Sequence, residues 1–301
     1  MSSFAIAGAG ALGCYYGARL AEAGNEVRFL LRSNYEVVRV EGLKVESIHG
    51  DILLPEVTCA RTPEEVGKVD VVMVSWKTTA NENYEKVIGP MLHENSLVLT
   101  MQNGLGNTER LSEIFGAERV MGALCFVCIN RLEAGLISHS GGGPIEMGCA
   151  LPGVTPKLEE LAAIFEKAKV KCVVSPNLGE SQWRKLVWNV PFNGLCITEG
   201  GIDTEALLAL PDGEEKVRAL MAEVIAGARA LGFKIGDSFA NTQLDRTYPM
   251  GPYRPSSMID FVEGREVEVE AIWGEPLRRA QAVGLEAPKL EALYQKILAM
   301  V

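Results

Sequence analysis

Residues 2–32 read SSFAIAGAGALGCYYGARLAEAGNEVRFLLR, and this stretch decides the fold. A short apolar run, Phe4 to Ala7, is followed by glycines at positions 8, 10 and 13 and by a helical apolar period from Ala11 to Ala23. Gly24 can end that helix, and Glu26 to Leu31 has the composition of a second strand. The stretch therefore predicts a strand, a tight turn, a helix and a second strand.

The glycines have the G-x-G-x-x-G spacing of a loop that binds the pyrophosphate of a dinucleotide. Gly8 allows the turn, Gly10 has no side chain to obstruct a phosphate, and Gly13 lets the helix pack closely on the strand. The phosphates would then meet free N–H groups at the start of the helix. With 31 glycines in the chain the spacing alone can arise by chance, but the flanking strand and helix favour a site formed by Gly8, Ala9, Gly10, Ala11, Leu12 and Gly13.

The residue after the second strand indicates which dinucleotide would bind. A site specific for NAD usually has Asp or Glu there to bind the ribose 2′-hydroxyl, whereas this chain has Arg32 followed by Ser33. A guanidinium beside a hydroxyl suits a 2′-phosphate, so NADP(H) is the predicted cofactor. The alternative is that Arg32 is an ordinary solvated arginine.

The composition is that of a globular protein long enough for two domains, with 301 residues of which 48% are hydrophobic. Its formal net charge of −10 argues against nucleic acid and anionic membranes as partners, so an anionic ligand must be held by individual cations. No stretch approaches the ~18 apolar residues of a membrane span. Met1 to Ser3 leaves no room for a signal peptide, so we expect a cytoplasmic protein.

The cysteines and histidines predict neither disulfides nor a metal site. Seven cysteines, an odd and scattered number, argue against a disulfide framework. The one C-x-x-C pair, Cys125 and Cys128, lies in an apolar run, where a strand would point the two side chains to opposite faces. The three histidines are isolated in the sequence, so they indicate neither a metal cluster nor a catalytic base.

Two further strands are expected to end at the sheet edge where ligands gather. Val69 to Ser75 is followed by Lys77, and Ser96 to Met101 is followed by Gln102, Asn103 and Gly104. Lys77 is either a contact to cofactor or substrate or a solvated lysine at a helix start. Asn103 is either a site residue or part of an Asn-Gly turn.

The pattern changes near residue 174. Before it, Leu43 to Ile48 and Ile52 to Cys59 resemble an antiparallel pair, and three glycine-punctuated strands follow at 120–130, 136–140 and 144–148. After it the apolar period is helical almost throughout. We predict an α/β protein: a Rossmann-type dinucleotide-binding domain over residues 1–174, an all-α domain over residues 175–301, and an active site in the cleft between them.

The second domain opens with WRKLVWNVPFNGLC, which places Lys185, Asn189 and Asn193 at i, i+4 and i+8 on one helical face. The residues around them are nearly all apolar, which favours a buried polar strip over an ordinary exposed face. Pro191 removes a backbone donor within this helix and predicts a kink. Further on, Ser256 and Ser257 provide hydroxyls, and Glu268 and Glu270 alternate with valines, so that at least one of the two carboxylates can point inward.

Taken together, these motifs resemble the ketopantoate reductase family. The matching stretches are GAGALG, Arg32, Lys77 after VVMVSW, QNG, WRKLVWNVPFN, SSM and EVEAIWG, and they occur in order along the whole chain. The resemblance implies NADPH-dependent reduction of 2-dehydropantoate (ketopantoate) to pantoate, in pantothenate synthesis. Two alternatives remain: a paralogue that acts on another branched 2-oxo acid, and a non-catalytic NADP-binding sensor. The sequence is also compatible with a homodimer.

The resemblance also implies residue roles. Lys185 would be the proton donor, and Glu268 would hold the reacting groups or the nicotinamide ribose. Lys77, Asn103 and the backbone near Cys128 would contact the cofactor. The substrate would be bound by Asn103, Lys185, Asn189, Asn193 and one serine: the spacing to Glu268 selects Ser256, and the Ser-Met dipeptide selects Ser257.

Two residues depart from the family pattern. Trp273 occupies a position where asparagine is common, and Asp203 falls where a further substrate-binding asparagine is often found. Both are expected near the substrate cavity, so the resemblance fixes the reaction type more firmly than the substrate.

Overall fold

The computed structural model describes residues 2–301, which form two compact units. The first comprises the chain up to Gln102 together with Asn107–Leu178, and the second comprises Asn103–Gly106 together with Gly179–Val301. All the described strands belong to the first unit, whereas the long segment of the second unit is helical. The predicted fold class, an α/β unit followed by a helical unit, is confirmed.

The first unit is built on one sheet of ten strands. Its order is β4-β3-β9-β8-β7-β6-β1-β2-β5, with β10 paired to β9. The pairs β3–β4 and β8–β9 are antiparallel and all other pairs are parallel. The strands are β1 Ser3–Ala7, β2 Glu26–Leu30, β3 Leu43–Ser47, β4 Ile52–Leu54, β5 Thr58–Ala60, β6 Val69–Val74, β7 Leu92–Thr100, β8 Val120–Glu133, β9 Leu136–Cys149 and β10 Cys172–Val174.

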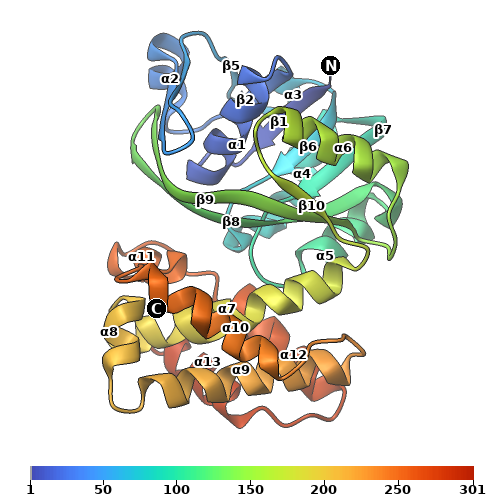
Figure 1. Ribbon diagram of the computed structural model, residues 1–301. Helices are drawn as coiled ribbons and strands as arrows, with labels where there is room; N and C mark the ends of the chain where they lie inside the picture. The colour runs from blue at the N-terminus through green and yellow to red at the C-terminus, as the bar shows by residue number, and fades with distance from the viewer. Residues whose placement is uncertain (1) are drawn as a thin grey trace. The chain divides into compact units, whose positions relative to one another are not determined.

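Both faces of this sheet are covered, which agrees with the apolar run at residues 71–74 of β6. Alternate residues of β1 enter different cores, because Phe4 and Ile6 join one cluster and Ala5 and Ala7 the other. Helices α1 and α6 pack in the first cluster, and α3, α4 and α5 in the second (Figure 1). The helices of this unit are α1 Ala11–Glu22, α2 Tyr35–Glu41, α3 Pro63–Val66, η1 Thr78–Asn83, α4 Tyr84–Ile88, η2 Gly89–Met91, α5 Asn107–Phe115, η3 Ala117–Arg119 and α6 Pro156–Lys167.

The second unit is a group of helices around a core of its own. Trp183, Val187 and Val190 of α7 lie in this core, and so does Leu105 from the short segment Asn103–Gly106. Helix α7 runs through Pro191 without a break. The elements are α7 Leu178–Thr198, α8 Thr204–Ala209, α9 Gly213–Ala230, α10 Ser238–Thr247, η4 Tyr248–Met250, α11 Ser256–Val262, the π-helix η5 Glu270–Gly274, α12 Glu275–Ala282 and α13 Pro288–Leu298.

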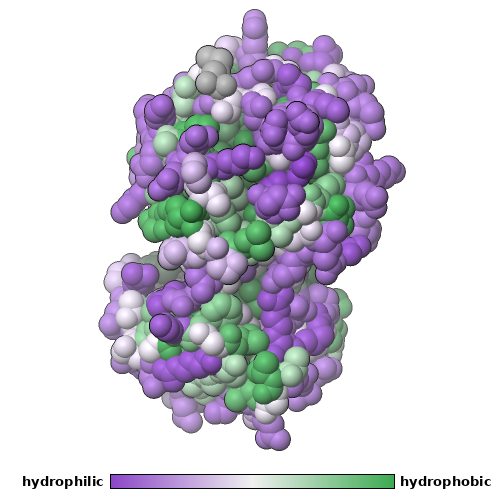
Figure 2. Space-filling view, turned by 90° about the vertical axis from the view of Figure 1, so that its right-hand side faces the viewer, coloured by the Kyte–Doolittle hydropathy of each residue, from purple (hydrophilic) through white to green (hydrophobic). Residues whose placement is uncertain are grey.

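The surface of each unit is mainly hydrophilic on the face seen in Figure 2, and its apolar residues form small separate groups. This agrees with the formal net charge of −10. Among residues 2–301 there is no helix long and apolar enough to cross a membrane.

A buried polar network ties α1 to β3 and β9. The guanidinium of Arg19, which is 1% exposed, donates to Ser47 Oγ at 2.9 Å. Ser47 Oγ lies 2.8 Å from His139 Nδ1, and His139 Nε2 lies 3.1 Å from the carbonyl oxygen of Gly141. Because that carbonyl can only accept, the proton of the neutral imidazole sits on Nε2, and Ser47 donates to Nδ1. Every polar atom of this imidazole is therefore satisfied in its neutral form.

This network predicts a loss of stability in mild acid. Burial, together with the neighbouring His49 and Arg19, holds the pKa of His139 below its ordinary value of 6.5. Below pH 6.5 the unfolded chain therefore binds more protons than the folded one, so the contribution of His139 is complete above that pH and is lost as the pH falls through the lowered pKa. Urea unfolding at about pH 7.5 and about pH 5.5 measures this loss, which should be smaller in His139→Gln than in the wild type. Equal losses in the two proteins would contradict it.

Candidate functional site

The glycine-rich loop has the geometry that the sequence predicts. Gly8 adopts φ +96°, and a Cβ there would lie 2.3 Å from the backbone nitrogen of Trp76. A Cβ at Gly13 would lie 2.6 Å from Gly8 O, so only glycine allows α1 to pack this closely. A Cβ at Gly10 would meet no described atom within 4 Å, which leaves space for a ligand in front of the helix. Each glycine therefore has a distinct structural role.

The N-terminus of α1 is open to an anion. Gly10 is its N-cap, and among the described residues no side chain caps the helix. Ala11, Leu12 and Gly13 form its first turn, where the N–H groups point out of the helix end. The residues thus fit the pyrophosphate of a dinucleotide, which is held by backbone N–H groups and the helix dipole.

Three other predicted cofactor residues also lie in the first unit. Arg32 is exposed and follows β2, whose last residue is Leu30. Lys77 is half-buried and is the N-cap residue of η1. It lies two residues after Ser75, whose backbone N–H donates to the carbonyl oxygen of Ala7 in β1. Cys128 lies half-buried in β8 opposite Gly141 of β9, close to an irregularity in the ladder. Ser33, which provides the hydroxyl next to Arg32 in the sequence, is exposed as well.

The predicted polar strip lies on α7 within the second unit. Lys185 is half-buried, whereas Asn189 and Asn193 are 8% and 2% exposed. Lys185 Nζ donates to Asn103 Oδ1 at 2.8 Å, although 82 residues separate the two in sequence. The structure therefore brings the predicted proton donor and the predicted Asn103 side chain together in one unit. Asn103 lies in this unit because the segment Asn103–Gly106 belongs to the helical unit, whereas the residues on either side of that segment belong to the first unit.

Asn193 connects α7 to α11. Its Nδ2 donates to the carbonyl oxygen of Asn189 at 3.1 Å, and its Oδ1 accepts from the backbone N–H of Ser257 at 2.9 Å. Ser257 is 2% exposed, whereas Ser256 is exposed to solvent. Of the two candidate serines, Ser257 is thus the one that lies beside the strip. The contact between Asn193 and Ser257 has no signal in the sequence, since it joins residues 64 positions apart.

The two candidate glutamates have different environments. Glu268 is 8% exposed and lies two residues before the start of η5, next to its N-cap Val269. Glu270 faces the surface, where it accepts from Arg278 at 2.7 Å and from the hydroxyl of Tyr294 at 2.6 Å. Burial raises the pKa of Glu270, but its hydrogen bonds from Tyr294 and Arg278 outweigh this and lower it overall. The inward carboxylate is therefore Glu268.

The two departures from the family pattern both have structural roles. Asp203 is the N-cap of α8 and accepts from the backbone N–H of Ala206 at 2.8 Å. Trp273, which is fully buried, donates from Nε1 to the carbonyl oxygen of Val190 at 2.9 Å. It packs across Gly194, where a Cβ would lie 2.8 Å from Nε1. Trp273 therefore belongs to the helical core.

A pair of tryptophan variants tests this role of Trp273. Trp183 is equally buried, but its indole nitrogen has no hydrogen-bond partner among the described residues. Trp273→Phe removes a hydrogen bond as well as volume, whereas Trp183→Phe removes volume and an N–H that makes no described hydrogen bond. We expect Trp273→Phe to lower the free energy of unfolding by about 1 kcal/mol more than Trp183→Phe. Urea unfolding of the two variants measures the difference, and equal losses would contradict the role.

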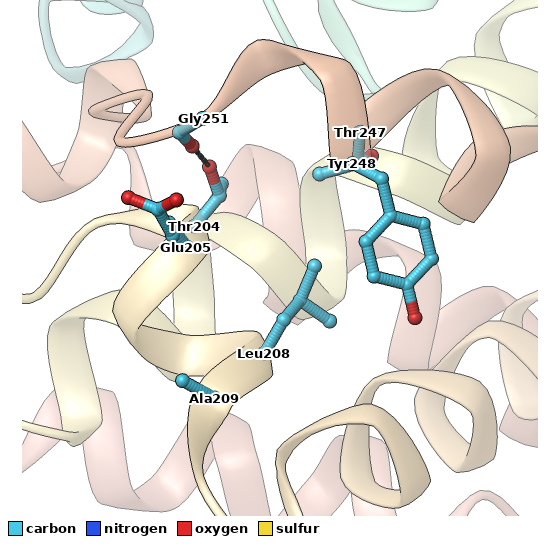
Figure 3. A pocket seen from close by; sticks show the side chains of 7 residues that line it. All are labelled: Thr204, Glu205, Leu208, Ala209, Thr247, Tyr248 and Gly251. Atoms are coloured by element: carbon cyan, nitrogen blue, oxygen red, sulfur yellow. Dashed lines mark hydrogen bonds between the residues drawn. The ribbon is translucent and has the colours of Figure 1, made fainter.

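The second unit also contains a cavity of about 230 Å³ between α8 and the α10–η4 region (Figure 3). Three hydroxyls of its lining hydrogen-bond within the unit, since Thr204 donates to Gly251 O at 2.9 Å, Thr247 to Gln243 O at 2.7 Å and Tyr248 to Glu214 at 2.5 Å. The predicted site residues are not among those that line it: Thr204, Glu205, Leu208, Ala209, Thr247, Tyr248 and Gly251. Within residues 2–301 there is likewise no group of three or more His, Cys, Asp or Glu side chains that could hold a metal ion.

Comparison with known proteins gives matches to both parts of the chain. The sequence model described as "Ketopantoate reductase PanE/ApbA" matches residues 4–152, and "Ketopantoate reductase PanE/ApbA C terminal" matches residues 177–301. A 2-dehydropantoate 2-reductase from Nostoc sp. is 42% identical over 299 residues, which cover 98% of this chain and 93% of the relative.

Solved structures match as well. The crystal structure of 2-dehydropantoate 2-reductase from Geobacter metallireducens is 46% identical, with a TM-score of 0.97 over 99% of this chain and 100% of that one. A D-mandelate dehydrogenase in complex with NADH and anilino(oxo)acetate is 20% identical, with a TM-score of 0.91 over 99% and 97% of the two chains. This last match shows a shared fold.

Proposed function

Because the chain belongs to the ketopantoate reductase family, we propose that it reduces 2-dehydropantoate to pantoate, a step of pantothenate synthesis, with NADPH as the hydride donor. The observation that carries the proposal is the 2.8 Å hydrogen bond from Lys185 Nζ to Asn103 Oδ1. Reduction of a carbonyl needs a proton for the oxygen as well as a hydride for the carbon. A lysine ammonium with a fixed orientation supplies that proton.

In the proposed mechanism Lys185 acts on the oxygen of the substrate's C2 carbonyl. Its ammonium stabilises the negative charge that develops on this oxygen and then donates a proton to it, which gives the hydroxyl of the product. Asn103 accepts one hydrogen of the ammonium and so fixes the directions of the other two. NADPH, when bound, supplies the hydride that the C2 carbon receives.

The substrate would be bound by the buried polar groups around Lys185. We assign Asn103, Asn189, Asn193 and Ser257 to this role, and Ser257 is preferred to Ser256 because Ser257 is buried beside Asn193. Part of the amide of Asn193 already binds the backbone, so it would act on the substrate largely by holding Ser257 in place. Glu268, the buried carboxylate, would hold the reacting groups or the nicotinamide ribose, as the family resemblance implies.

The cofactor would be bound by the first unit. The family is one of dinucleotide-binding reductases, and the open N-terminus of α1 supports pyrophosphate binding at Gly8–Gly13. For NADPH in particular the support is Arg32, an exposed guanidinium after β2 where an NAD-specific site would carry a carboxylate. Lys77 and the backbone near Cys128 are further proposed cofactor contacts.

A steady-state assay tests the proposal. NADPH oxidation is followed with ketopantoate and with a panel of other branched 2-oxo acids, and ketopantoate should give the highest kcat/KM. A higher kcat/KM for another acid would favour the alternative of a paralogue with a different substrate. Asp203 is the reason to test this alternative, because the family pattern has an asparagine amide where this chain has a carboxylate. Tight NADPH binding without oxidation by any acid would favour a sensor.

A further inference from the structure

The π-helix η5 has one carbonyl group that the helix itself does not satisfy. In the π register the N–H of Glu275 donates to the carbonyl oxygen of Glu270 rather than to that of Ala271. The next residue is Pro276, which has no N–H. The carbonyl oxygen of Ala271 instead accepts from the backbone N–H of Leu105 at 2.9 Å. The sequence EAIWGEP thus creates an acceptor that a distant segment fills.

Gly104 makes the approach of that segment possible. It adopts φ +80°, and a Cβ there would lie 2.2 Å from the oxygen of Ala271 and 2.4 Å from its carbonyl carbon. Any side chain would therefore push the segment away from η5. Leu105 adds an apolar anchor, because it is 3% exposed in the core of the helical unit. Two adjacent residues thus fix Asn103–Gly106 on the π-helix.

Asn103 directly precedes these two anchors and accepts from Lys185 at 2.8 Å. We infer that η5 is a positioning device for the proton donor: Ala271 and Pro276 hold Gly104 and Leu105 in place, and Asn103 in turn aims the ammonium of Lys185. Gly104, Ala271 and Pro276 are positioning residues, since they act through Asn103. The inference rests on the proposed function in that Lys185 transfers the proton. A π-helical turn is rare and occurs frequently at functional sites, which agrees with this role.

The chain offers a matched pair of variants. Gly104 and Gly106 lie in the same segment and both have positive φ angles, +80° and +88°. A Cβ at Gly106 meets nothing closer than the side chain of Glu275 at 3.8 Å, however. Gly106→Ala therefore measures the cost of the backbone conformation alone, and Gly104→Ala adds the displacement from η5.

We expect Gly104→Ala to lower kcat by about tenfold or more, because a small displacement of a catalytic group costs up to about 100-fold. Gly106→Ala should stay within about threefold of the wild type. The solvent deuterium isotope effect on kcat should rise in Gly104→Ala only, because a misaligned ammonium slows the proton transfer. A loss of folded enzyme alone would leave that isotope effect unchanged.

Amide hydrogen exchange at Leu105 reports the docking without any substrate. Its N–H should be protected in the wild type and in Gly106→Ala, and should exchange faster in Gly104→Ala. If the wild type does not reduce ketopantoate, the proposed function is overturned. The exchange rates at Leu105 still show, independently of activity, whether Gly104 lets the segment Asn103–Gly106 pack on η5. Equal exchange and equal kcat in the two variants would overturn the inference, and so would faster exchange with an unchanged kcat.

Should Gly104→Ala fail to fold, Pro276→Ala decides the question. This variant leaves the segment untouched but gives the helix an N–H that competes with Leu105 for the carbonyl oxygen of Ala271. Faster exchange at Leu105 together with a lower kcat supports the positioning device. Unchanged exchange and kcat overturn it.

Discussion

The Lys185→Ala variant is expected to reduce ketopantoate about 100-fold more slowly than the wild type, or slower still, which is the usual scale for the loss of a positioned general acid. The hydrogen bond from Lys185 to Asn103 holds the ammonium in one orientation, and alanine removes both the proton and the positive charge. NADPH affinity should remain nearly unchanged, because the proposed dinucleotide loop lies in the other unit. Single-turnover NADPH oxidation with saturating ketopantoate measures the rate, and a binding titration measures the affinity.

Lys296→Ala is the matched control for this variant. Lys296 lies in the same unit, and its side chain is 53% exposed beside Glu199. The same loss of charge there should leave kcat within about threefold of the wild type. If Lys185→Ala is also within about threefold, the proton donor must be Lys77 or water and the assignment of Lys185 is wrong.

The Arg32→Asp variant is expected to weaken NADPH binding by about 2 kcal/mol, or about 30-fold, through the loss of charged hydrogen bonds to the 2′-phosphate and the added repulsion. NADH lacks that phosphate, so its affinity should change much less. Titration of both cofactors against the wild type and the variant gives the two changes separately. The ratio of the two affinities is therefore the decisive quantity.

Arg110→Asp controls for the change in net charge. Arg110 lies on α5 in the same unit, and its side chain is 61% exposed. An equal charge reversal at this position should weaken both cofactors slightly and equally, since exposed charges at a distance are screened. If Arg32→Asp also affects NADPH and NADH equally, or affects neither, Arg32 does not bind the phosphate.

Local pattern was sufficient to predict the first part of the fold. The strand, turn and helix of residues 2–24 follow from apolar periodicity and glycine spacing, and the observed β1 and α1 agree with them within one residue at each end. The helical second unit follows from the change of period. The family resemblance, which rests on motifs along the whole chain, is confirmed by the matches to residues 4–152 and 177–301.

The prediction of one strand from Ile52 to Cys59 was wrong. The chain bends at Pro55, which cannot donate a backbone hydrogen bond, and forms β4 and β5 instead. These two strands lie at opposite ends of the sheet order. Conversely, the separate strands predicted at 136–140 and 144–148 are one continuous β9, in which Gly142 and Gly143 adopt positive φ angles next to ladder irregularities. Periodicity does not reveal such long-range pairing.

The site could be predicted where its residues share one helix. Lys185, Asn189 and Asn193 lie on α7 as their spacing indicates. The choice between Ser256 and Ser257 needed the structure, because neighbouring residues of a helix point in different directions and only burial separates them. The pairing of Asn103 with Lys185 and the π-helix η5 were not predictable either. Both depend on contacts between segments that are distant in sequence.

Because Asn103–Gly106 belongs to the helical unit, neither unit is one continuous stretch of sequence. The chain passes from one unit to the other at three places. A gene fragment that starts at Gly179 would encode the helices without Leu105, a residue of their own core. A single recombination event that exchanges one continuous gene segment therefore cannot transfer the complete helical unit. Exchange of substrate specificity between relatives would have to carry four residues from the middle of the other unit along with it.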